Sequence, residues 1–218
     1  MSIMRRVFTL VLALCVLSSM TLPALADKWD LAKGDITIDF QTNVETAAVE
    51  QYVTQSDGNG GFDSAPLIYT NEVTDNTITV DTRDSKGQAA QFTIQDVNIV
   101  VDQNTNAIDF EDGSQAVMTV SGNNSINHVD VAAKGTAAAI HVGDQADVTI
   151  QGDGDGKNFL NINDNTHYQS TRGAGIGSDG ATSSADGEDF TATLTFTGDV
   201  TVDSNGAYNG AGIGSGQY

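Results

Sequence analysis

Cysteine and proline are almost absent from the 218 residues. Cys15 is the only cysteine, and Pro23 and Pro66 are the only prolines. Cys15 lies in an N-terminal segment that we expect to be removed, so the mature chain is predicted to have no disulfide, no cysteine-ligated metal and no thiol nucleophile. Burial, ladder hydrogen bonds or bound ions must therefore hold it together.

Basic residues are scarce as well. The chain has 9 Lys and Arg against 29 Asp and Glu, a formal net charge of -20. This charge repels a polyanionic duplex or an anionic bilayer, so we expect no nucleic-acid partner. The acidity is compatible with solubility alone or with carboxylates that meet divalent cations, and composition leaves both readings open.

Residues 1–26 have the pattern of a secretory signal. Arg5 and Arg6 precede an uncharged apolar run, and Ala24-Leu25-Ala26 has the small-x-small form that signal peptidase accepts. The run is short for a membrane span of ~20 residues, and Leu14 stands where lipid attachment at Cys15 needs a small residue. We therefore predict a secreted, extracellular or cell-surface protein, with residues 27–218 as one domain that does not insert into the membrane after cleavage.

Period-two alternation of apolar and polar residues dominates after Gly34. Segments such as "DITIDF" (35–40) and "TATLTFT" (191–197) are separated by Gly, Asn, Asp and Ser clusters, which is typical of half-buried strands joined by turns. The one candidate helix is short, residues 44–53, whose valines and threonine also suit a strand. Without helical crossovers a doubly wound α/β fold is excluded, and the sequence predicts an all-β protein.

A degenerate repeat recurs in the second half of the chain. "TAAAIHVGD", "RGAGIGSDG" and "NGAGIGSGQ" align on Ile140, Ile176 and Ile213, with spacings of 36 and 37 residues. Recurrence of a strand, a turn and a run of small residues at a nearly fixed period indicates a solenoid. We expect these three isoleucines to be the inward-facing anchors of successive coils.

The second copy contains a literal G-x-G-x-x-G at Gly175, Gly177 and Gly180. A phosphate-binding loop of this form must follow a buried strand and open a helix, and neither flank fits. The structural alternative is that small residues let stacked backbones approach and bend. We therefore predict turn roles for the glycines of both copies: Gly173, Gly175, Gly177, Gly210, Gly212 and Gly214.

These segments, with "FTIQDVNIVVD" (92–102) and "AAAIHVGDQADVTIQGDGDG" (137–156), resemble the right-handed parallel β-helix regions of large bacterial cell-surface proteins. Those regions have a pectate-lyase-like coil and are described as adhesin-like or carbohydrate-binding. The resemblance implies a right-handed parallel β-helix, export, and binding of polysaccharide or calcium. Its lyase members carry basic catalytic residues, whereas Arg83 and Arg172, the only arginines after the signal, belong to no lyase motif.

The acidic turn "GDGDGK" (152–157) offers oxygen ligands for a hard cation such as Ca²⁺. It is not an EF-hand, because Lys157 occupies the third ligand position. The bland alternative is a solvated turn; if calcium binds, the predicted ligands are Asp153, Asp155 and Asp164. The three histidines are not spaced as a zinc motif.

The sequence thus predicts a non-catalytic protein for binding or adhesion, with a polysaccharide or surface glycan as the partner. The alternative is a calcium-dependent polysaccharide lyase or hydrolase on the same coil. We expect Trp29 to cover the N-terminal end of the stack. Since the third repeat copy has no polar cap, we also expect a longer protein or end-to-end self-association.

Overall fold

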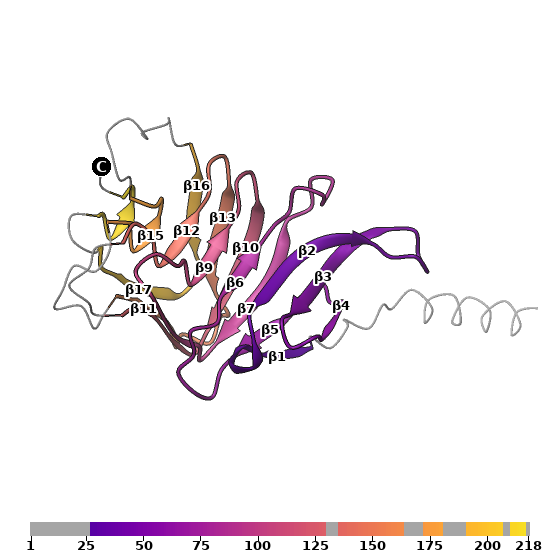
Figure 1. The fold of residues 1–218 in the computed structure, drawn as a ribbon, viewed down its shortest axis with the longest axis horizontal. Helices are drawn as coiled ribbons and strands as arrows, with labels where there is room; N and C mark the ends of the chain where they lie inside the picture. The colour runs from indigo at the N-terminus through magenta and orange to yellow at the C-terminus, as the bar shows by residue number, and fades with distance from the viewer. Residues whose placement is uncertain (1–26, 130–134, 164–171, 181–190, 207–209, 217–218) are drawn as a thin grey trace, which may run out of the picture.

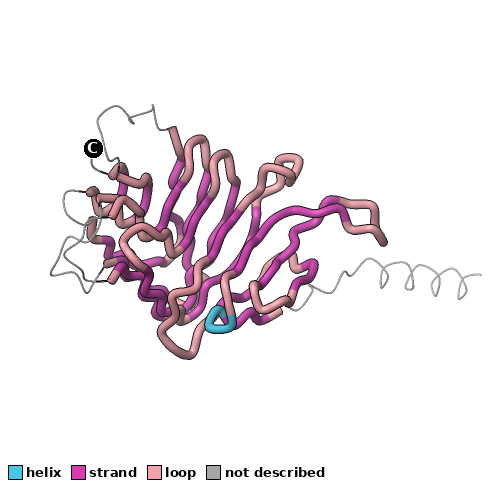
Figure 2. Tube along the Cα trace, in the orientation of Figure 1, coloured by secondary structure: helices cyan, strands magenta, loops and turns pink. Residues whose placement is uncertain are grey.

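The computed structural model describes residues 27–129, 135–163, 172–180, 191–206 and 210–216, which form strands and turns (Figure 1). One short helical turn, η1 (Leu31–Lys33), is the only helix among them (Figure 2). The expected all-β class is confirmed. The strands are β1 (Lys28–Asp30), β2 (Ile36–Thr42), β3 (Val49–Gln55), β4 (Gly60–Phe62), β5 (Leu67–Tyr69), β6 (Ile78–Val80), β7 (Ala90–Gln95), β8 (Asn98–Val101), β9 (Ile108–Phe110), β10 (Gln115–Ser121), β11 (Asn123–His128), β12 (Ile140–Val142), β13 (Asp147–Gly152), β14 (Asn158–Ile162), β15 (Ile176–Gly177), β16 (Thr193–Thr197), β17 (Val200–Ser204) and β18 (Ile213–Gly214).

These strands make three sheets. Sheet A has the order β1-β5-β7-β10-β13-β16, sheet B the order β18-β15-β12-β9-β6-β2-β3-β4, and sheet C the order β17-β14-β11-β8. From β7 onwards the chain visits A, C and B in turn, four times over, and from β9 onwards each strand pairs in parallel with the one three places earlier. Figure 1 shows the result as rows of strands lying side by side.

A ladder of isoleucines runs through sheet B and forms part of the core. Successive strands pair at the positions Ile36, Ile78, Ile108, Ile140, Ile176 and Ile213. The first five are fully buried, in one cluster with Phe92 of sheet A and Ile99 of sheet C. The register of Ile140, Ile176 and Ile213 is the one that the repeat alignment predicts.

The expectation that Ile213 is buried like the other two isoleucines of the repeat is wrong. Its side chain is 49% exposed because β18 is the outermost strand of sheet B and no described residue packs over it. Ile213 therefore continues the register of the ladder, but it does not add a buried side chain to the core.

The repeat glycines lie where the backbones of successive repeat copies meet. A Cβ on Gly175 would lie 2.6 Å from the carbonyl oxygen of Gly212, and one on Gly173 would lie 2.3 Å from that of Ala137. Gly177 and Gly214 are in strands β15 and β18 and not in turns, with φ of 139° and 132°. Close approach and backbone angle, the two reasons given for glycine, therefore both apply here.

The expected helix over residues 44–53 is wrong. Residues 44–46 form a turn, and β3 runs antiparallel to β2 from Val49. Val53 faces inwards opposite Ile38 and is fully buried. The strand preference of the β-branched valines therefore outweighs the helix preference of Ala47 and Ala48. Trp29 is buried at this end, as expected, and its indole Nε1 donates a hydrogen bond to Asp63 Oδ2 (3.1 Å). No helix in the described part of the chain is long and apolar enough to span a membrane.

Candidate binding face

The outward side chains of sheet C form a polar row across its four strands. Alternation turns Ile99, Ile126 and Ile162 inwards. The alternate positions that face outwards are paired strand to strand, and the row they form is Asn98, Ser125, Asn161 and Asp203.

A second outward row, two residues away along the strands, contains an exposed aromatic ring. Phe159 on β14 is paired with Asn123 on β11 and with Thr201 on β17, and it is 42% exposed. The Asn161 side-chain amide donates a hydrogen bond to Asn123 Oδ1 (2.9 Å). The ring thus lies beside two asparagine side chains that hold each other in place. We call these two rows together the sheet C face.

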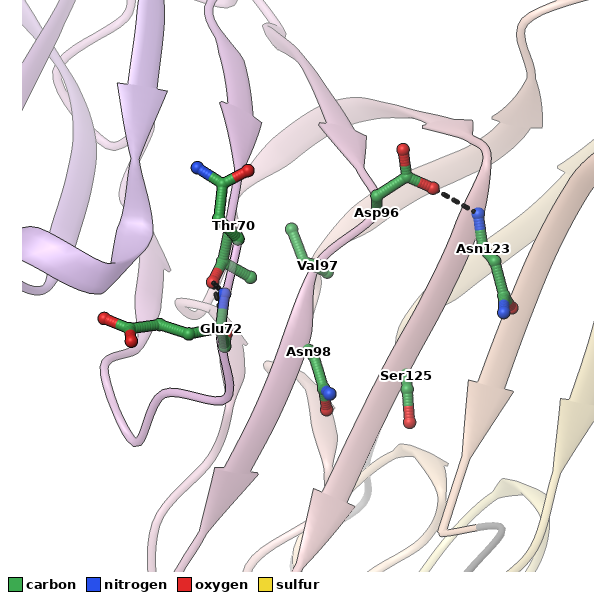
Figure 3. A pocket seen from close by; sticks show the side chains of 8 residues that line it. Thr70, Glu72, Asp96, Val97, Asn98, Asn123 and Ser125 are labelled. Carbon is green, nitrogen blue, oxygen red and sulfur yellow. Dashed lines mark hydrogen bonds between the residues drawn. The ribbon is translucent and has the colours of Figure 1, made fainter.

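A groove of about 260 Å³ opens beside the first strands of this face (Figure 3). One wall is the segment after β5, which Thr74 ties to β8: its amide donates to the carbonyl of Asn98 (3.0 Å) and its carbonyl accepts from the amide of Val100 (2.8 Å). The other wall comes from β8, β11 and the turn before β8. The lining residues are Thr70, Asn71, Glu72, Asp96, Val97, Asn98, Asn123 and Ser125.

Local hydrogen bonds fix the shape of the groove. The amide of Glu72 donates to Thr70 Oγ1 (3.0 Å), which closes a tight turn. Asp96 has φ of 52°, and its Oδ1 accepts from the amide of Asn123 (2.9 Å; Figure 3). An aspartate tolerates this left-handed conformation because its short side chain bonds nearby backbone. These bonds join the groove to the strands beneath it.

Several polar groups in the groove are free to bind a ligand. Among the described residues, none forms a hydrogen bond with the side-chain amide of Asn98 or with the carboxylate of Glu72. Glu72 is exposed and Asn98 is partly exposed. Ser125 Oγ accepts a hydrogen bond from Asn127 Nδ2 (2.8 Å), which leaves the Ser125 hydroxyl hydrogen able to donate. The groove can therefore offer both donors and acceptors.

Two of the calcium ligands expected from the sequence, Asp153 and Asp155, do not line the groove. Asp153 and Asp155 are exposed in the loop between β13 and β14, and they accept hydrogen bonds from the amides of Asp155 (3.0 Å) and Lys157 (2.8 Å). The loop is held by Asp199, whose carboxylate accepts from the amides of Gly154 (3.2 Å) and Gly156 (2.6 Å). The loop's amides thus converge on an anionic group, and the sequence analysis missed Asp199.

No three His, Cys, Asp or Glu side chains come together as a metal site among the described residues. Asp153 and Asp155 are therefore not part of such a group there. Asp164, the third predicted ligand, lies outside the described residues.

The two histidines that the structure describes lie on different sheets, His128 on β11 and His141 on β12. His128 is buried, its ring nitrogens 3.3 Å from Asn163 Oδ1 and 3.2 Å from the carbonyl oxygen of Thr105, and burial lowers its pKa. His141 Nδ1 lies 2.7 Å from Asp109 Oδ1 on the outer side of sheet B. Burial opposes the charge of His141, but the bond to Asp109 and the nearby carboxylates outweigh it, so its pKa is raised.

The sequence analysis also missed the sheet C face, although a signal was present. In "NFLNI" (158–162) the inward residues are Leu160 and Ile162, so alternation places Phe159 outside. The groove itself had no signal, because it joins segments that are distant in the sequence. Comparison with protein-family models, curated proteins and solved structures finds no match to this chain, so a function must be argued from the face alone.

Proposed function

We propose that the chain is a right-handed parallel β-helix. The repeated A, C, B order and the unbroken parallel register of β7 to β18 support this architecture. Parallel strands joined by a crossover are almost always connected in the right-handed sense, because of strand twist. The three sheets would then be the faces of one coil, with the isoleucine ladder inside.

On this scaffold we propose a non-catalytic carbohydrate-binding function, located on the sheet C face. The observation that carries it is the exposed ring of Phe159 beside the paired amides of Asn123 and Asn161 and next to the groove. A sugar ring has apolar C–H faces and a rim of hydroxyl groups. A flat aromatic side chain packs against the former, while amides, hydroxyls and carboxylates bind the latter.

Binding without turnover fits the groove better than the enzymatic alternative. Its lining contains no Lys, Arg or His to serve as the base of a lyase. Of its two carboxylates, Asp96 already accepts the amide of Asn123. The signal pattern of residues 1–26, outside the described residues, supports a role outside the cell or at its surface.

The test compares binding by the intact protein and two phenylalanine variants. Affinity electrophoresis against a panel of soluble polysaccharides should show retardation that Phe159→Ala reduces. Phe62→Ala is a matched control, because Phe62 is 41% exposed but lies on β4, away from sheet C. Equal retardation of both variants, or no retardation by any glycan, would refute the proposal.

The same panel separates binding from catalysis and from a role for calcium. Reducing-end and unsaturated-product assays, run with and without calcium, should detect no cleavage of a bound polysaccharide. Release of products would favour the lyase or hydrolase instead. Loss of binding with a chelator would restore the calcium prediction for Asp153, Asp155 and Asp164.

A further inference from the structure

We propose that the sheet C face selects uncharged glycans, and that the glycan lies across the strands from the groove to Phe159. This inference rests on the proposed carbohydrate-binding function. It departs from the polyuronate ligands that a pectate-lyase-like coil would suggest. It comes from the charges around the face and from the part of the face that is open.

The charges around the face are almost all negative. Glu72 and Asp96 line the groove, and Asp203 ends the polar row. Lys157 precedes Phe159 by two residues, but Asp153 and Asp155 come just before it in the same exposed loop. The chain as a whole carries -20. A polyuronate, with a carboxylate on every sugar, would meet like charges within the ~8 Å screening length of physiological salt.

The same carboxylates suit a neutral sugar. An ionised carboxylate accepts hydrogen bonds only, and sugar hydroxyls donate them. The Ser125 hydroxyl hydrogen and the Asn98 amide supply the donors that the remaining hydroxyl oxygens need. Bonds to a charged acceptor are stronger than neutral ones, so the acidic groove strengthens binding to a neutral ligand while it repels an anionic one.

The open part of the face gives the direction. Asn127 has an outward position on β11, yet it is only 5% exposed, so the face is covered two residues beyond Ser125. Asn123 and Phe159 of the second row remain exposed, and Asn161 of the first row is partly exposed. Adjacent strands are ~4.8 Å apart, so a ligand that leaves the groove at β11 reaches Phe159 on the next strand. The groove would hold one sugar and Phe159 would pack on its neighbour.

The experiment measures affinities by calorimetry for an uncharged β-glucan, polygalacturonate and chitosan, each at low and physiological salt. The intact protein should bind the β-glucan, with polygalacturonate at least about tenfold weaker. Phe159→Ala should weaken β-glucan binding about tenfold and Phe62→Ala less than about twofold. Thermal melting of each variant shows whether the fold is retained.

A charge reversal in the groove tests the selection directly. Glu72→Lys should raise the affinity for polygalacturonate at low salt about tenfold or more. Glu45→Lys makes the same change in net charge at the exposed turn between β2 and β3 of sheet B, which does not line the groove, and should raise this affinity less than about twofold. Equal gains in both variants would show a general charge effect and contradict the proposal.

The outcomes separate the inference from the function beneath it. Polygalacturonate binding as tight as β-glucan binding, and sensitive to Phe159→Ala, would overturn the inference while the carbohydrate-binding function stands. Chitosan binding that is tighter than β-glucan binding and insensitive to Phe159→Ala would also overturn it, since the face would then select positive charge. Binding to none of the three would overturn both.

Discussion

The two ends of the strand stack solve the same problem differently. At the N-terminal end, β3 lies antiparallel on β2 and side-chain amides replace the missing strand. Gln51 Nε2 donates to the carbonyls of Asp63 (2.8 Å) and Gln91 (3.0 Å), and its Oε1 accepts from the amide of Gln91 (2.8 Å). Gln55 Nε2 bonds two further carbonyls in the same way. The amide of a glutamine side chain thus makes the hydrogen bonds that a backbone peptide group of a neighbouring strand would make.

The other end, formed by β16, β17 and β18, has no such cover among the described residues. Phe196 is 37% exposed and Ile213 is 49% exposed, although both follow the register of buried residues in the preceding strands. Leu194, Val200 and Val202 are only partly buried. The side chains are of the core type, but no described residue packs on their far side.

The comparison shows that the burial of an inward side chain depends on the strand that lies next to its own in the sheet. Residues of one type at one register position therefore contribute different free energies of unfolding according to their neighbours. Edge strands also expose unpaired backbone groups, which the N-terminal end satisfies with buried glutamines. Four predictions test how far this contrast holds.

The largest difference is expected between two isoleucines of the same ladder. Ile108→Ala should lower the free energy of unfolding by about 2–5 kcal/mol, because Ile108 is fully buried and the change leaves a cavity. Ile213→Ala should cost about 1 kcal/mol, since half of its surface is already exposed. Urea denaturation followed by circular dichroism measures both. Equal losses would mean that the end of the stack is covered in solution.

The second prediction concerns Gln51. Gln51→Ala should cost about 2–4 kcal/mol, because it leaves the carbonyls of Asp63 and Gln91 and the Gln91 amide without that partner. Gln41→Ala is the control, since Gln41 is exposed and its side chain donates to the carboxylate of Asp39, two residues away. If the two variants unfold at the same urea concentration, the glutamine cover does not stabilise the N-terminal end.

The third prediction perturbs the other end through a backbone contact. A Cβ on Gly177 would lie 1.8 Å from the carbonyl oxygen of Gly214, and φ is 139°. Gly177→Val should therefore weaken the pairing of β15 with β18 by about 1–3 kcal/mol.

Amide exchange reports this locally. The Ser178 amide donates to Gly214 O (3.1 Å) and should exchange faster in the variant. Gly61→Val is the control, because no atom lies within 4 Å of a Cβ built there. Unchanged exchange at Ser178 would contradict the close contact.

Alternation in the sequence was sufficient to predict the strands and the all-β class, because each strand buries one face. The repeat alignment found three of the six isoleucines in the ladder. It missed Ile36, Ile78 and Ile108 because their spacings, 42, 30 and 32 residues, differ as loops vary in length. The antiparallel β3 was missed because Ala47 and Ala48, just before it, suggest a helix, while its place is decided by pairing with β2.

The candidate site was much less accessible to sequence reasoning. The acidic loop attracted attention because its aspartates are close in sequence, but its structural partner, Asp199, is more than forty residues later. The groove joins a turn after β5 to strands β8 and β11, which come together through strand pairing and the bridge between Thr74 and Ile99. Local patterns predict which way a side chain points, and they do not predict what lies beside it.

The smallest effects on stability are expected from pH. They compare a buried histidine, His128, with a histidine on the outer side of sheet B, His141. Burial lowers the pKa of His128 below its ordinary value of about 6.5, so the unfolded chain takes up a proton more readily and stability falls as pH drops below about 6.5. His141 has the opposite sign. Its raised pKa contributes stability below about 6.5, and this is lost as pH rises through the raised value.

Urea midpoints between pH 5 and 8 measure both slopes. His128→Gln should flatten the acidic side of the profile, and His141→Gln the neutral to alkaline side. A profile in which each variant flattens the other limb would show that His141, beside Asp109, is the residue held neutral. The difference in pKa between the two histidines would then have a cause other than the burial of His128.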